Sequence, residues 1–148
     1  MSFFGDIFAG KAAQAGSEFN AKILERNAKI DEQRAEQLMS VHNDYSLPKF
    51  DKTVEEIQGK TTVAYLSSGA AMSGTVLEAL YDQELELQRD RDNLQYNAEN
   101  ARDQAYNDAI QKRADADLAR WRGKVAKKAS YYAAGASLLD LGTKVMAA

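Results

Sequence analysis

The chain of 148 residues contains no cysteine, a single proline and a single histidine. The absence of cysteine excludes a disulfide framework and a thiolate metal site. Valine, isoleucine and threonine are scarce and do not alternate with polar residues, which argues against a β-sheet. No uncharged apolar run reaches the roughly 20 residues of a membrane-spanning helix. Residues 1–10 lack the basic start and the length of a signal peptide, so we expect none.

What the chain does contain is abundant alanine, leucine, glutamate, glutamine, arginine and lysine, the residues that favour helix. Hydrophobic residues make up 45%, but alanine supplies many of them and the mean hydropathy is −0.52. Such a chain forms thin helical layers instead of a thick core. We therefore expect an all-α fold, an elongated helical hairpin or coiled-coil-like assembly with little or no β structure.

Three segments are predicted. Residues 1–46 combine an apolar N-terminal tip with a first long helix, in which apolar residues recur at helical spacing on one face. These residues are Phe19, Ile23, Ile30, Leu38 and Val41. The helix is expected to end at Ser46-Leu47-Pro48, because the residue before a proline is disfavoured in the right-handed helical region.

Residues 47–74 are expected to hold a short helix and a Ser/Gly-rich hinge. Thr53 with Glu56 fits a capping box that would begin the short helix. Gly69 can end that helix in the left-handed conformation, and Thr75 with Glu78 fits a second capping box. The predicted hinge residues are Gly69, Ser73, Gly74 and Thr75.

Residues 75–148 are expected to form one very long C-terminal helix, with its continuity through Gly123 left open. Its apolar positions are mostly alanine: Leu80, Leu87, Leu94, Ala98, Ala101, Ala105, Ala109, Ala116 and Ala119. Two triplets, Leu87/Ala98/Ala109 and Leu94/Ala105/Ala116, repeat every eleven residues, a period typical of nearly straight or right-handed coils. Because an alanine seam buries little apolar area, we infer self-association or packing on other proteins.

Charge is unevenly distributed along this segment. Residues 78–108 carry nine acidic residues against three arginines, whereas residues 112–128 carry seven basic residues against two aspartates. The basic block precedes an apolar tail rich in small residues, 129–148. The block is a candidate contact for anionic lipid or, non-specifically, for DNA, through Arg120, Arg122, Lys124, Lys127 and Lys128. The alternative is a solvated helix face.

Both chain ends are apolar and aromatic, and antiparallel packing of the first and last helices would bring them to the same pole. Candidate membrane or partner contacts are Phe3, Phe4, Ile7, Phe8, Trp121, Tyr131, Tyr132, Leu138 and Leu139. Basic and aromatic residues beside an apolar segment suit a membrane interface. Packing of both ends on neighbouring subunits explains the same pattern, so both hypotheses stay open.

Nothing in the sequence indicates catalysis. His42 is expected to be structural, and no phosphate-binding loop or hydrolase motif occurs. We therefore predict no enzyme activity, cofactor, metal or small-molecule substrate.

Several motifs occur in an order that resembles a known family. They are FNAKILERNAKIDEQRAEQL (19–38), LSSGAAMSGTVLEAL (66–80), YNAENARDQAYNDA (96–109) and AAGASLLDLG (133–142). The most distinctive is the pair Ser68-Gly69 and Ser73-Gly74. In these features the chain is similar to the internal virion, or DNA-ejection, proteins of tailed phages, including short-tailed coliphages.

The resemblance implies a virion protein that oligomerises near the portal and contacts portal or other internal proteins. On infection it would be ejected and help to form a conduit for DNA across the host envelope. The alternative is a structural helical adaptor or scaffold of a virion or other large assembly, without a membrane role. An intracellular coiled-coil module unrelated to phage is a third hypothesis.

Overall fold

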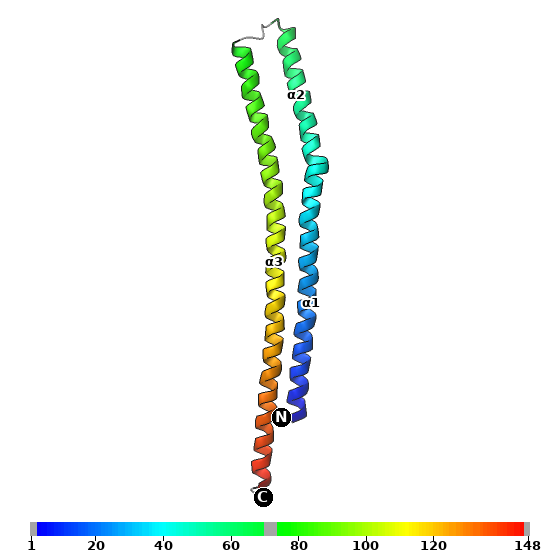
Figure 1. Ribbon diagram of the computed structural model, residues 1–148, viewed down its shortest axis with the longest axis vertical. Coiled ribbons are helices and arrows are strands. Elements are labelled where there is room, and N and C mark those ends of the chain that lie inside the picture. Colours follow the sequence, from blue (N-terminus) through cyan, green and yellow to red (C-terminus); the bar gives the residue numbers. More distant parts are fainter. Residues whose placement is uncertain (1–2, 70–73, 147–148) are drawn as a thin grey trace. The chain divides into compact units, whose positions relative to one another are not determined.

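The computed structural model describes residues 3–69 and 74–146, with side chains placed for residues 4–69 and 74–139. The elements are α1 (Phe3–Val41), the π-helix η1 (His42–Ser46), α2 (Leu47–Ser67) and α3 (Thr75–Met146), as labelled in Figure 1. Every described residue outside these helices lies in a turn, and none lies in a strand. The expected all-α fold with a very long C-terminal helix is confirmed. The helix α3 has 72 residues and continues through Gly123.

Contacts divide the chain into two units, Met1–Glu32 with Asn107–Ala148, and Gln33–Tyr106. In the first unit, the start of α1 lies antiparallel beside the later part of α3, blue beside yellow to orange in Figure 1. Arg120 Nη2 lies 2.7 Å from Glu25 Oε1, and the Ser137 hydroxyl donates to Asp6 Oδ2 at 3.3 Å. In the second unit, α2 lies antiparallel to the earlier part of α3, and Gln83 Nε2 donates to Thr61 Oγ1 at 3.3 Å.

The seam of the first unit consists of the smallest side chains. Its fully buried residues are Ala21, Ala28, Ala109, Ala116 and Ala134, each at most 1% exposed. Gly10 and Gly123 are buried at the same interface. A Cβ atom on Gly123 would lie 2.6 Å from Ser17 Cβ, so the helices approach as closely as small residues allow. The predicted alanine seam of α3 is confirmed at Ala105, Ala109 and Ala116.

The apolar face predicted for the first helix does not form its seam. Phe19, Ile23, Ile30 and Val41 are 65%, 43%, 51% and 58% exposed, and Leu38 is half-buried. The buried positions are instead alanines seven residues apart: Ala21, Ala28 and Ala35. Larger side chains at those positions would hold the helix axes apart, because interaxial distance depends on the side chains at the contact.

The expected helix end at Pro48 is also wrong. Ser46 and Leu47 both keep right-handed helical angles, and Pro48 occupies the first turn of α2. The preceding turn is a π-helix, in which the Leu47 N–H bonds to the His42 carbonyl. A π turn widens the backbone by one residue, so it accommodates the missing N–H and the ring of the proline without a break.

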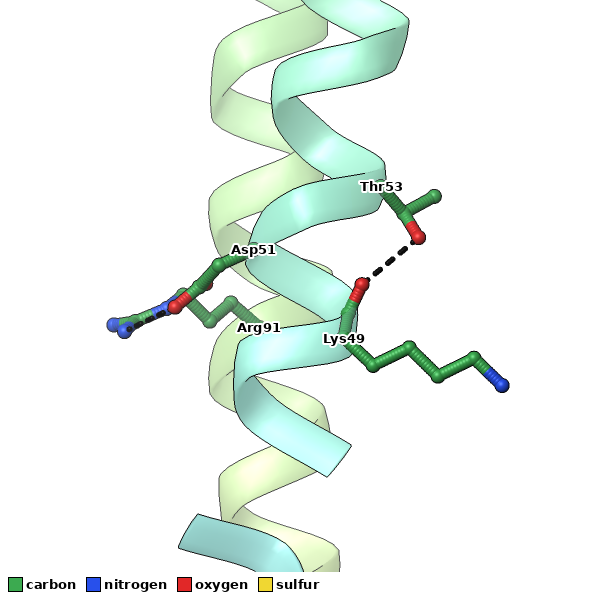
Figure 2. Close-up of polar contacts among 4 residues, drawn as sticks. All are labelled: Lys49, Asp51, Thr53 and Arg91. Atoms are coloured by element: carbon green, nitrogen blue, oxygen red, sulfur yellow. Dashed lines mark hydrogen bonds and ion pairs between the residues drawn. The ribbon is translucent and has the colours of Figure 1, made fainter. Parts of the chain in front are cut away.

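Thr53 does not begin a helix, contrary to its capping-box pattern. It lies inside α2, which starts six residues earlier, and its hydroxyl donates to the Lys49 carbonyl at 2.9 Å (Figure 2). A threonine one turn into a helix bonds backward to the carbonyl four residues before it, so the same motif is compatible with a helix interior.

Two of the predicted hinge residues, Gly69 and Gly74, have positive φ. Gly69 follows the end of α2 with φ +73, and its N–H bonds to the Leu66 carbonyl at 3.2 Å. Gly74 has φ +57 and its carbonyl accepts the first bond of α3, from Glu78 N–H at 3.1 Å. Gly74 is therefore the N-cap and Thr75 the first helical residue. The helix α3 begins at Thr75 as predicted, but Thr75 is not the N-cap that a capping box with Glu78 requires. Ser73 lies outside the described residues.

Candidate functional site: the basic and aromatic surface of α3

Three of the seven bases in the basic block are neutralised within the chain. Lys112 pairs with Asp31, Arg113 Nη2 lies 2.7 Å from Glu32 Oε1, and Arg120 pairs with Glu25 and Asp117. Hydrogen bonding to the Glu25 carboxylate is the main cause that raises the pKa of Arg120, although partial burial opposes it. Since these partners all stand on α1 or on α3 itself, these bases hold the antiparallel pair in register.

The other four bases of the block face outward. Arg122, Lys124 and Lys128 are exposed and Lys127 is half-buried. Among the described side chains, none of the four has an ion-pair partner. Of the residues predicted to contact anionic lipid or DNA, these four can therefore still bind an anion. Arg120 is already paired with Glu25 and Asp117.

Lys124, Lys127 and Lys128 border a groove of about 370 Å³. Trp121, Val125 and Tyr131 supply its apolar lining, and Gln14 of α1 closes one side. Trp121, Val125 and Lys128 follow one another at one-turn spacing on α3, and the groove extends from them to Lys127 and Gln14 at the contact of the two helices. Its lining of aromatic rings edged by ammonium groups suits an apolar or aromatic ligand that carries negative charge.

The aromatic and leucine residues proposed for the tail are also exposed. Trp121, Tyr131 and Tyr132 are 61%, 45% and 78% exposed, and Leu138 and Leu139 are 49% and 75% exposed. Large apolar side chains gathered on one surface mark an interaction site more often than single exposed residues do.

At the opposite end of the chain, Phe4 and Phe8 are each 69% exposed, whereas Ile7 is half-buried. The side chain of Phe3 lies outside the described residues. Because Asp6 accepts a hydrogen bond from Ser137, the structure brings the N-terminal aromatic residues to the level of the tail. The expectation that both ends lie close together is met within the first unit.

The described residues provide neither a metal site nor a membrane-spanning helix. Within them, no group of three or more His, Asp or Glu side chains is placed to hold a metal ion. None of the described helices has an apolar stretch long enough to cross a bilayer.

Two features of this site were missed from the sequence. The pairing of Lys112, Arg113 and Arg120 with α1 was not foreseen, and neither was the contribution of Gln14 to the groove. The alanine heptad Ala21, Ala28, Ala35 was the available signal, since it fixes which side of α1 meets α3 and hence which charges face each other.

Comparison with family models, with curated proteins and with solved structures finds no match to this chain.

Proposed function

We propose that the protein is an internal virion protein of a tailed phage, which oligomerises near the portal and is ejected to help form a DNA conduit across the host envelope. The observation that carries the assembly part of the proposal is the outward position of the large apolar side chains of α1 and α3. A helix pair that buries only alanine and glycine and exposes phenylalanine, isoleucine and tryptophan requires further partners.

Contact with a host membrane is supported by the four outward bases beside the exposed aromatic residues. Trp121, Tyr131 and Tyr132 have the amphipathic rings that favour the headgroup region, and each nearby lysine or arginine adds about 1 kcal/mol of attraction to an anionic surface. The phage context itself is supported by the resemblance of motifs in chain order.

A truncation tests the function. Phage whose protein lacks 129–148 are expected to assemble normally and to lose infectivity. Failure of particles to form would favour the structural adaptor instead. Because the truncation also removes Ala134 and Ser130 from the seam, a second variant is needed that keeps the seam intact.

Leu138→Ser combined with Leu139→Ser meets that need, since these side chains are 49% and 75% exposed. Particles carrying this variant should contain the protein at the normal copy number, yet deliver less DNA to the host. Normal DNA delivery would refute the conduit role. The matched control is Asn20→Ser, an exposed polar position of α1.

A further inference from the structure

One exposed row of α1 repeats every eleven residues. Phe8, Phe19 and Ile30 are 69%, 65% and 51% exposed, and all belong to the first unit. Eleven residues make three helical turns with little drift, so the three side chains stand in line. We call them the α1 row.

The facing part of α3 has a row with the same spacing. Ile110, Trp121 and Tyr132 are 63%, 61% and 78% exposed and belong to the same unit. Ala114, Val125 and Ala129 fill the intervals on the same side and are exposed too. We call Ile110, Trp121 and Tyr132 the α3 row.

Each row lies on the side of its helix opposite the alanine seam. Phe8 stands two residues from Gly10, Phe19 two from Ala21, and Trp121 two from Gly123. Two residues correspond to about 200° around a helix of 3.6 residues per turn. Each helix therefore has two packing faces, one occupied by its neighbour in the same chain and one uncovered.

The two rows also match in register. Within the chain, Gly10 meets Ser130 and Gly123 meets Ser17. Phe8 is two residues before Gly10 and Tyr132 two residues after Ser130, so Phe8 and Tyr132 are level. Phe19 is two residues after Ser17 and Trp121 two residues before Gly123, so Phe19 and Trp121 are level. The same antiparallel alignment places Ile30 level with Ile110, so each member of one row is level with a member of the other.

We propose that the uncovered face of α1 in one copy docks on the uncovered face of α3 in a second copy, with the α1 row against the α3 row in the register of the chain's own seam. Each copy then offers one face of each kind, so the contact is heterologous and builds a closed ring or an open array of alternating α1 and α3 segments. This deepens the self-association in the proposed function by naming its interface.

Matched spacing favours a second copy as the occupant. The α1 row and the α3 row repeat every eleven residues, and their members lie level with one another in the antiparallel alignment of the chain. A contact between copies of this chain requires such a match. Lipid would not require equal spacing on two helices, and Arg26 lies in line with Phe8 and Phe19, where hydrocarbon would disfavour it.

Cysteine cross-linking tests the interface, because the natural chain has no cysteine background. The full-length variants Phe19→Cys and Trp121→Cys are purified, mixed and treated with a short bismaleimide. The mixture should give covalent dimers, and the double variant should give a ladder of higher multimers. Neither single variant alone should cross-link, since each row meets the other row and not itself.

The matched control mixes Asn20→Cys with Lys124→Cys, two exposed positions on the same turns but off the rows. Cross-linking of the Phe19/Trp121 mixture no better than this control would overturn the proposal. Efficient cross-linking of Phe19→Cys with itself would also overturn it, because it would show a two-fold contact between α1 faces.

A second measurement, of the oligomeric state in solution, needs no cysteine cross-linking. Sedimentation velocity should show multimers for the natural chain and monomers for Phe19→Asp, with the control Asn20→Asp unchanged. Monomers of the natural chain would contradict the proposal. Because these experiments use purified protein, a confirmed interface with normal infectivity of interface variants would refute the proposed function and leave the interface standing.

Discussion

The glycines whose surroundings the structure describes occupy three different environments, and each responds differently to an added methyl group. Gly16 has open space where a methyl group would stand, Gly123 meets Ser17 across the seam, and Gly69 and Gly74 have positive φ. The same substitution, glycine to alanine, therefore separates helix propensity from close packing and from backbone conformation.

We expect Gly123→Ala to lower stability although it improves helix propensity. The new Cβ would lie 2.6 Å from Ser17 Cβ and 3.4 Å from Gln14 Cα, and neither atom can turn aside as a flexible side-chain end would. Overpacking of this kind costs about 1–3 kcal/mol. Thermal unfolding followed by circular dichroism should show a lower Tm, at fixed protein concentration.

Gly16→Ala is the matched control in the same unit, because nothing lies within 4 Å of its added methyl group. It should raise stability by about 0.5–1 kcal/mol through propensity alone. Equal Tm values for Gly16→Ala and Gly123→Ala would show that the seam is looser than the geometry indicates.

Gly69→Ala should destabilise the connection between α2 and α3. A left-handed residue with a Cβ costs about 1–2 kcal/mol, and Gly69 has φ +73. The matched control is Gly59→Ala, which lies inside α2 with open space around it and should stabilise slightly. If Gly69→Ala and Gly74→Ala leave stability, assembly and infectivity unchanged, the hinge hypothesis fails.

Among the helices, the sequence was informative about type and less so about boundaries and orientation. The period of alanine and leucine along α3 predicted its helix and its seam correctly, because a long uninterrupted pattern leaves few alternatives. Pro48 and Thr53 were misread, since both local signals are compatible with a helix start and with a helix interior. The groove around Trp121 was not predictable, because it depends on which residue of α1 lies opposite.

The π turn between α1 and α2 gives a prediction about elements. Deleting the exposed residue Asn43 should convert this turn to a regular α-helix and place Pro48 in a helix interior. An interior proline costs about 3 kcal/mol or more, so the deletion alone should lower the Tm clearly. The deletion combined with Pro48→Ala should recover most of that loss, because the substitution restores the N–H and removes the ring.

Thermal unfolding of the single and double variants measures this effect. Deleting Gly59 instead is the control, because it also rotates the end of α2 by about 100° but leaves the π turn in place. If Pro48→Ala does not restore the Tm of the Asn43 deletion variant, the π turn is not needed to accommodate the proline.

For the molecule as a whole, the outward bases predict how the protein responds to lipid charge. Full-length protein should bind vesicles containing phosphatidylserine more strongly than phosphatidylcholine vesicles, and binding should fall as salt rises. The variant Lys124→Gln/Lys127→Gln/Lys128→Gln should lose most of the preference for anionic vesicles. Lys112→Gln is the control, since Lys112 is already paired with Asp31.

Co-flotation with the vesicles measures this preference. Equal binding of the triple variant and the natural chain would show that these lysines do not contact lipid. Absence of binding to either vesicle would remove the membrane contact from the proposed function and would favour the structural adaptor.

The alanine seam affects which antiparallel alignment α1 and α3 adopt in the first unit. Because Ala21 and Ala28 are identical and seven residues apart, a slide of one heptad places alanine on alanine again, so apolar contacts discriminate weakly between the two alignments. The observed alignment is instead selected by the ion pairs Asp31–Lys112, Glu32–Arg113 and Glu25–Arg120, because a slide of seven residues would separate them. Such partly exposed pairs weaken as salt rises, so ionic strength sets how firmly the two helices are held against sliding.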